Sequence, residues 1–153
     1  MTDATPGFTL VRVVDATPER IWSAWTSADE AAQWWHPRGF TTPRESVTID
    51  ARVGGAFSYT MVNDATGVEY VTVGDYREVT APEKLVFGWG GTDAAAADLP
   101  VITVSIESLG ELSRITFDLR GHEGVAGDGD FYDGWESALD ELVQYLGQNE
   151  VFG

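Results

Sequence analysis

Hydrophobic side chains recur at every second position in five segments between residues 47 and 119. The sets are Val47 and Ile49; Phe57, Tyr59 and Met61; Leu85, Phe87 and Trp89; Ile102, Val104 and Ile106; and Ile115, Phe117 and Leu119. Turn-forming residues separate these runs at 54–55, 63–67, 81–83 and 110–111. Because successive side chains of a strand point to opposite faces, each set predicts a β-strand with one buried face. The spacing of the turns favours an antiparallel meander.

An earlier strand and two short helices precede this region. Residues 8–15 are rich in β-branched side chains and predict the first strand. Thr17 is suited to cap a helix whose first position is Pro18. Ser27 and Glu30 have the spacing of a capping box, so a second short helix is expected there, ending before Pro37.

A long amphipathic helix is predicted at the C-terminal end, from Asp128 to a stop at Gly147. Its apolar stripe recurs at helical spacing and consists of Phe131, Trp135, Leu139, Leu142 and Leu146. Acidic residues lie in its first turns, where they favour the positive end of the helix dipole. One strand, two short helices, about six strands and a long helix together predict an α+β fold in which the helix covers one face of an antiparallel sheet.

Length and composition predict one folded domain over residues 1–153. The chain has 153 residues, of which 43% are hydrophobic and 22% are charged, as in ordinary globular domains. The segment at 90–97, rich in glycine and alanine, is expected to be a loop.

The charge balance excludes some partners. A formal net charge of −16 repels phosphate backbones and anionic lipid, so neither nucleic acid nor a membrane is expected as a partner. The same charge is explained by solubility or by a basic protein partner. The chain has no cysteine, no signal segment is visible, and no apolar run reaches membrane-spanning length, which together favour the cytoplasm.

No cofactor or metal is expected. His36 and His122 are the only side chains that titrate near neutral pH, and both occur in polar segments typical of solvated loops. The acidic residues around Asp130 lack the glycine spacing of a calcium loop and are better explained as helix caps. Arg38, beside two tryptophans, could hold a ligand carboxylate or pair with a neighbouring acid.

Aromatic residues are abundant, with six Trp, seven Phe and five Tyr. Such side chains can build a ligand pocket or an ordinary core. Both alternatives remain open at this point, although Trp25 and the leucines of the terminal helix favour the core because of their helical spacing.

Four segments resemble one known family. They are TPERIWSAWTSADEAAQWWHPRGF at 17–40, VTIDARVGGAFSYTM at 47–61, GDYREVTAPEKLVFGW at 74–89 and DGWESALDELVQYL at 133–146. Their order is similar to that in proteins related to the C-terminal domain of the activator of heat-shock protein 90 ATPase, within the START and birch-allergen superfamily. The resemblance implies a helix-grip fold: a curved antiparallel sheet of about six or seven strands, two short helices after the first strand, and a long C-terminal helix enclosing an apolar cavity.

The resemblance also implies which residues surround that cavity. The aromatic ones are Trp34, Trp35, Phe40, Tyr59, Tyr76, Trp89, Phe117 and Trp135. Trp89 is expected at the rim on its position alone, because it ends an apolar set and two glycines follow it. Arg38, Tyr59 or Tyr76 would meet the polar end of a ligand.

Three functions are compatible with this resemblance. The first is binding of a small hydrophobic or amphipathic molecule. The second is a co-chaperone in the stress response that binds and activates a heat-shock protein 90 type ATPase. The third, which has the least support, is a cavity enzyme of the cyclase or hydratase type using Glu45, Asp50, Tyr59 or His122.

Overall fold

The computed structural model describes residues 6–91, 99–127 and 131–148. Within them, the strands are β1 (Gly7–Val14), β2 (Phe40–Thr41), β3 (Thr48–Ile49), β4 (Ala56–Asn63), β5 (Glu69–Thr80), β6 (Lys84–Gly91), β7 (Val101–Ser108) and β8 (Ser113–Arg120). The helices are α1 (Pro18–Thr26), α2 (Ala28–Trp34) and α3 (Phe131–Gln148), with a short 3-10 turn, η1 (Arg44–Ser46).

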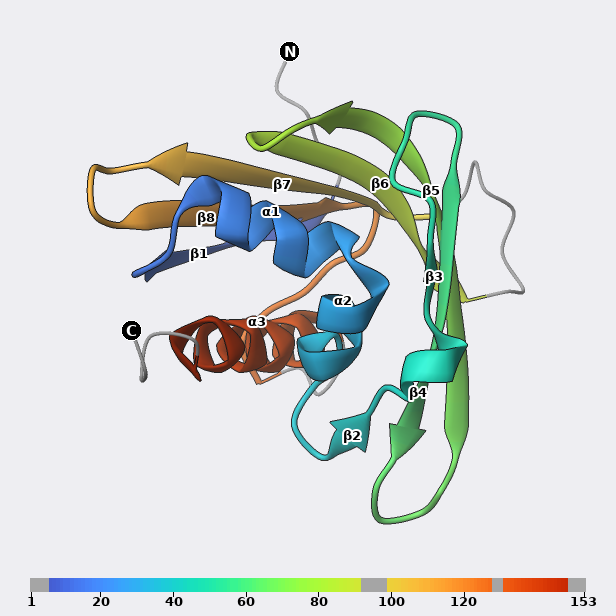
Figure 1. Ribbon diagram of the computed structural model, residues 1–153. Helices are drawn as coiled ribbons and strands as arrows, with labels where there is room; N and C mark the ends of the chain where they lie inside the picture. Colours follow the sequence, from blue (N-terminus) through green and yellow to red (C-terminus); the bar gives the residue numbers. More distant parts are fainter. Residues whose placement is uncertain (1–5, 92–98, 128–130, 149–153) are drawn as a thin grey trace.

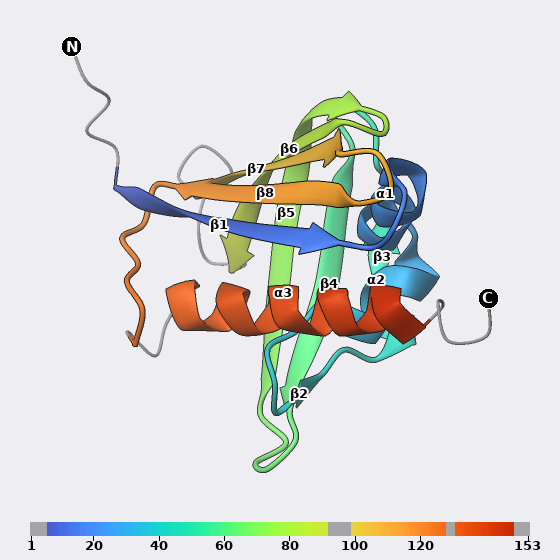
Figure 2. The same cartoon turned by 90° about the vertical axis from the view of Figure 1, so that its left-hand side faces the viewer.

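The strands form one antiparallel sheet in the order β1-β8-β7-β6-β5-β4-β2, with β3 also paired to β4. The sheet bends around α3, so that β1, β8 and β7 lie above the helix and β4 and β5 lie beside it (Figure 1). Turned by 90°, the same structure shows α3 running across the concave side of the sheet (Figure 2). The α+β helix-grip prediction is therefore confirmed.

Two local features accompany the bend. The pairing of β5 with β6 shifts register between Tyr76 and Glu78, and such a bulge increases twist and bends a strand. At Gly74, a Cβ atom would lie 1.9 Å from the carbonyl oxygen of Gly88 and 2.3 Å from the ring of Phe57. Only glycine allows the chain to pass this close to its neighbours.

The two short helices begin at the caps that the sequence predicts. Thr17 accepts a hydrogen bond at 3.1 Å from the backbone N–H of Arg20, and Pro18 occupies the first position of α1. Ser27 accepts one at 3.4 Å from the N–H of Glu30, which starts α2. Both cap predictions are confirmed.

The Glu30 side chain has a further role. Its carboxylate accepts hydrogen bonds from Arg20 and Ser23 of α1, and from the Tyr145 hydroxyl of α3 at 2.9 Å. The guanidinium of Arg20 also lies 4.9 Å from the centre of the Tyr145 ring. One carboxylate thus connects all three helices beside the sheet.

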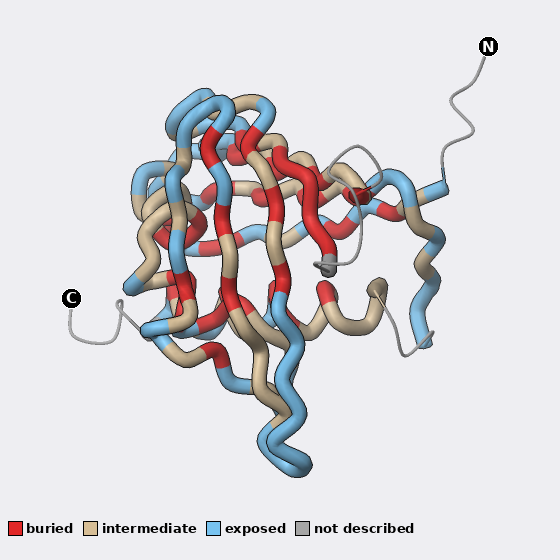
Figure 3. The backbone as a smooth tube through the Cα atoms, turned by 90° about the vertical axis from the view of Figure 1, so that its right-hand side faces the viewer, coloured by how far each residue is buried: buried red, intermediate tan, exposed pale blue. Residues whose placement is uncertain are grey.

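The core lies between α3 and the inner face of the sheet. Four of the five predicted stripe residues of α3 are buried there, with Trp135 4% exposed, Leu139 and Leu142 fully buried, and Leu146 2% exposed, whereas Phe131 is partly buried. Along the strands, buried and less buried positions alternate, as the red and tan segments of Figure 3 show. The period-two and helical patterns therefore identified the two faces that pack together.

Some details differ from the sequence prediction. The sequence pattern gave no apolar set for β5, because five of its twelve residues are exposed and its buried positions are Thr72, Gly74 and Tyr76. The helix α3 continues through Gly147 to Gln148. Gly90 and Gly91 belong to β6, whereas the rest of the predicted loop at 92–97 lies outside the described residues, as do Asp128 and Asp130.

No helix in the described ranges is long and apolar enough to cross a membrane.

Candidate functional site

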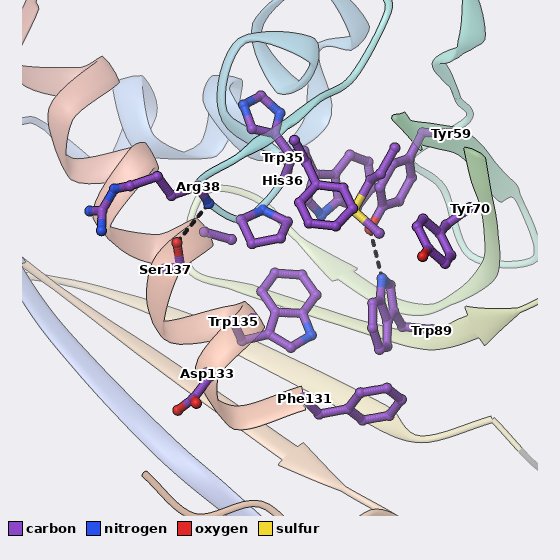
Figure 4. Close-up of a pocket in the computed structure, with 15 residues that line it drawn as sticks. Trp35, His36, Arg38, Tyr59, Tyr70, Trp89, Phe131, Asp133, Trp135 and Ser137 are labelled. Carbon is purple, nitrogen blue, oxygen red and sulfur yellow. Dashed lines mark hydrogen bonds between the residues drawn. The ribbon is translucent and has the colours of Figure 1, made fainter. Parts of the chain in front are cut away.

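A cavity of about 530 Å³ lies between the first half of α3 and the inner face of the sheet (Figure 4). The segment that joins α2 to β2 contributes Trp35, His36, Pro37, Arg38 and Phe40. The sheet contributes Tyr59, Met61, Tyr70 and Trp89, and α3 contributes Phe131, Asp133, Gly134, Trp135, Ser137 and Ala138. A volume of this size is typical of sites for small organic molecules.

The α2–β2 segment is held in place by hydrogen bonds around Trp35. The backbone N–H of Trp35 donates to the carbonyl oxygen of Ala31 at 2.8 Å, which ends α2. The buried hydroxyl of Thr42 then donates to the carbonyl oxygen of Trp35 at 3.0 Å. These bonds fix the Trp35 indole, 2% exposed, against the cavity.

The same network includes His36. Its Nδ1 atom lies 3.0 Å from the Thr42 hydroxyl, which also lies 3.0 Å from the carbonyl oxygen of Trp35. While Thr42 donates its one proton to Trp35, Nδ1 of His36 is the donor to Thr42. The imidazole points away from the centre of the cavity (Figure 4), so His36 supplies part of the wall rather than a base inside it.

On the sheet side, Tyr59 and Trp89 form a buried polar pair. The indole N–H of Trp89 donates to the Tyr59 hydroxyl at 2.7 Å. Trp35 stacks on Tyr59 with ring centroids 4.1 Å apart and an interplanar angle of 20°. Trp89 is only 9% exposed, which corrects its expected place at the rim: its indole is held inside by this hydrogen bond and by packing on Trp135.

The helix wall combines large and small side chains. Trp135 packs its ring on Phe117 and Trp89, at 4.6 and 5.2 Å between centroids. Gly134 and Ala138, one helical turn apart, leave room beside it, and a Cβ atom at Gly134 would meet nothing within 4 Å. A larger side chain at position 134 would therefore have room beside the cavity.

The two charged residues of the lining direct their charges away from the cavity (Figure 4). The Arg38 side chain is 76% exposed and its Nε lies 4.0 Å from Glu141, while its backbone N–H donates to Ser137 at 2.7 Å. The carboxylate of Asp133 accepts a hydrogen bond from the N–H of Gly127 at 2.8 Å. The inner wall is thus apolar and uncharged.

Burial shifts the pKa of two wall residues toward their neutral forms. Burial raises the pKa of Tyr59 well above its usual value, and the hydrogen bond from Trp89 only partly opposes this. Burial also lowers the pKa of His36, against the opposing attraction of Glu141 and Asp64. Near neutral pH both side chains therefore favour the uncharged state.

Of the nine predicted site residues, six line the cavity: Trp35, Arg38, Phe40, Tyr59, Trp89 and Trp135. The other three, Trp34, Tyr76 and Phe117, lie outside the lining. Trp34 is fully buried and donates its indole N–H to the carbonyl oxygen of Ala24 at 2.9 Å. Tyr76 and Phe117 pack behind other aromatic rings of the core. Sequence position alone could not separate these two layers.

Several lining residues were not predicted as site residues. Met61 and Phe131 belong to periodic sets, so their inward direction was visible in the sequence. Gly134 and Ala138 carry a weaker signal, namely two small residues four apart beside a tryptophan. Tyr70 had no signal, because it lies among the three exposed residues at the start of β5 and is 48% exposed itself.

The candidate acid and base residues of an enzyme do not meet in the cavity. Among Glu45, Asp50, Tyr59 and His122, only Tyr59 is part of the lining. Asp50 pairs with Arg52 at 2.8 Å, and His122 lies against the ring of Phe131 at 4.0 Å between centroids. In the described part of the chain, no group of three His, Asp or Glu side chains could hold a metal ion.

The chain matches the model of a protein family described as "Activator of Hsp90 ATPase homolog 1-like protein", over residues 15–147. A search of curated proteins gave no match.

Solved structures with the same fold come from several bacteria. A protein of Chromobacterium violaceum is 25% identical, with a TM-score of 0.78, covering 92% of this chain and 96% of that one. The AHSA1 protein of Silicibacter pomeroyi is 24% identical, with a TM-score of 0.74, covering 94% of this chain and 99% of that one. A protein of Nitrosomonas europaea is 19% identical, with a TM-score of 0.78, covering 97% and 99%. These likenesses support the helix-grip architecture across nearly the whole chain.

Proposed function

We propose that this chain, which belongs to the Activator of Hsp90 ATPase homolog 1-like family, binds a small, largely apolar molecule in the cavity between its sheet and its C-terminal helix. The observation that carries the proposal is the aromatic, uncharged inner wall of a cavity of about 530 Å³. A folded core has no need of such a space, because interiors are normally packed to the density of organic crystals.

The wall chemistry narrows the ligand. Trp35, Tyr59 and Trp135 offer ring faces, and such faces favour flat apolar or aromatic molecules. Burying an unpaired charge against them would be costly. Since the Arg38 guanidinium points outward, the buried part of the ligand is uncharged, and any charged end lies in solvent near the α2–β2 segment.

A matched pair of dyes tests this proposal. N-phenyl-1-naphthylamine is uncharged, and 8-anilino-1-naphthalenesulfonate has the same ring skeleton with an added sulfonate. Titration of the protein with each dye should give saturable binding of one molecule of the uncharged dye, with blue-shifted emission, and weaker binding of the sulfonate. No saturable binding of the uncharged dye, or binding that survives when urea unfolds the protein, contradicts the proposal.

A second candidate function is regulation of a heat-shock protein 90 type ATPase, which the description of the matching family favours. The charge pattern is compatible with it. All nine Lys and Arg side chains are in ion pairs, and the excess of acidic side chains leaves a net charge of −16. Such a surface suits a basic partner and makes binding sensitive to salt. We propose a cytoplasmic location for either function, because a chain without cysteine suits a reducing compartment.

Binding to the purified chaperone separates the two candidates. A co-chaperone should bind at low salt, lose affinity as salt increases, and raise the rate of ATP hydrolysis. A ligand carrier should do neither, with its cavity empty or filled by the uncharged dye.

A further inference from the structure

Three indole rings line the cavity, and among the described residues only one of their three N–H groups has a partner. Trp89 donates to Tyr59, whereas no residue in the described ranges accepts from the buried Nε1 atoms of Trp35 and Trp135. Figure 4 shows Trp35 and Trp135 on opposite sides of the cavity. Their side chains are 2% and 4% exposed, so bulk solvent does not satisfy these donors.

A buried donor without an acceptor is unusual, because leaving it unpaired destabilises the folded protein. The polar groups of the wall bond to one another instead. The Tyr59 hydroxyl accepts from Trp89, and the carbonyl oxygen of Trp35 accepts from Thr42. Two of the rings that line the cavity thus carry N–H donors that no described residue satisfies.

We propose that the ligand is a planar ring molecule with an uncharged carbonyl-type oxygen, which accepts a hydrogen bond from the unpaired indole N–H of Trp35 or Trp135. This inference rests on the proposed function and specifies its ligand class. A hydroxyl or amine group fits less well, because it would bring a donor of its own that needs an acceptor. A carboxylate would bring a charge into a wall from which Arg38 is turned away.

A matched pair of probes tests the acceptor. 9-Fluorenone and fluorene share three fused rings of nearly the same shape and differ by a carbonyl in place of a methylene. Each is titrated as a competitor of N-phenyl-1-naphthylamine. Although fluorene is the more hydrophobic of the two, the proposal expects fluorenone to bind about tenfold more tightly, as one added hydrogen bond to a buried donor would give. The infrared carbonyl stretch of bound fluorenone should also move to lower wavenumber than in an apolar solvent.

The donor is tested by an isosteric replacement. Site-specific incorporation of 3-benzothienylalanine at position 135 or 35 keeps the bicyclic shape but replaces the N–H by sulfur. At one of these positions at least, the preference for fluorenone should fall about tenfold and the carbonyl shift should disappear. The control is the same replacement at Trp25, whose N–H is also buried and unpaired but which is not part of the cavity lining. That variant should keep both properties.

The outcomes separate the two proposals. If both probes displace the dye with equal affinity, or if neither replacement changes the preference, the carbonyl inference is wrong and the apolar cavity stands. If neither probe nor the dye binds, the proposed function itself is wrong.

Discussion

The indole N–H of Trp89 in β6 donates to the hydroxyl of Tyr59 in β4, at 2.7 Å, across the intervening strand β5. β5 places Gly74, which has no side chain, opposite Trp89. The two long side chains can therefore meet over β5 and form one wall of the cavity. This wall of the candidate site therefore depends on the pairing of β4, β5 and β6.

Tyr59→Phe should destabilise the protein by about 1–3 kcal/mol, because the buried N–H of Trp89 would lose its acceptor. Urea unfolding measures the change. Tyr70→Phe is the matched control: it removes the same hydroxyl from a side chain that is 48% exposed, and should change stability by less than about 0.5 kcal/mol. Equal midpoints for the two variants would show that the Tyr59 bond contributes nothing.

Alkaline pH should unfold the protein through its buried tyrosines. Burial raises the pKa of both Tyr59 and Tyr76 in the folded state above the usual value of about 10. A raised pKa means that the folded state holds these protons more tightly than the unfolded state does. Their contribution to stability is therefore complete below pH about 10 and is lost as the pH rises further.

The measurement is a titration of phenolate absorbance alongside circular dichroism. We expect Tyr59 and Tyr76 to ionise only as the protein unfolds, and Tyr76→Phe to lessen the loss of stability at high pH. Ionisation of all five tyrosines with an intact native spectrum would refute the assignment.

Gly134→Leu should close the cavity without loss of stability. A Cβ atom at position 134 meets nothing within 4 Å and Gly134 lines the cavity, so we expect the added side chain to fill cavity space. Leucine also favours a helix over glycine by about 0.5–1 kcal/mol. We expect binding of N-phenyl-1-naphthylamine to weaken at least tenfold, about 1.4 kcal/mol, with an unchanged or higher unfolding midpoint.

Two controls accompany this variant. Gly134→Ala adds one methyl group and should leave most of the binding. Gly147→Leu makes the same replacement in the same helix, at an exposed glycine away from the cavity lining, and should leave binding unchanged. Full dye binding by Gly134→Leu would mean that the dye binds elsewhere.

Gly74→Ala should destabilise the sheet by about 3 kcal/mol or more, because the new Cβ atom would overlap the carbonyl oxygen of Gly88 and the ring of Phe57. Thermal and urea unfolding measure the loss. Gly134→Ala serves again as the control, since its added methyl group meets no atom. Comparable stability of the two alanine variants would contradict the close approach at Gly74.

Added salt should raise the melting temperature. All nine cationic side chains are already paired, which leaves a net charge of −16. The excess acidic side chains repel one another in the folded protein, and salt screens this repulsion. The exposed ion pairs that salt also weakens contribute only about 0–1 kcal/mol each. Melting curves in increasing sodium chloride, repeated in potassium chloride, should rise alike. A falling melting temperature would show that the ion pairs outweigh the repulsion.

The sequence by itself determined the local elements and the faces that they bury. Thr17 and Ser27 predicted where α1 and α2 begin, because a cap needs only the backbone next to it. Leu139 and Leu142 predicted the buried face of α3, because helical periodicity is a property of the chain alone. The family resemblance then predicted how these elements assemble, and the matching family model agrees.

Only the tertiary structure decided which aromatic residues line the cavity and which fill the core. Trp34 and Trp35 are neighbours in sequence, yet Trp34 bonds to Ala24 in the interior whereas Trp35 faces the cavity. The outward direction of the Arg38 guanidinium was equally invisible in the sequence. These outcomes depend on where α3 crosses the bent sheet. That position is set by contacts between residues about a hundred positions apart, such as Arg38 and Ser137, which a local sequence pattern does not predict.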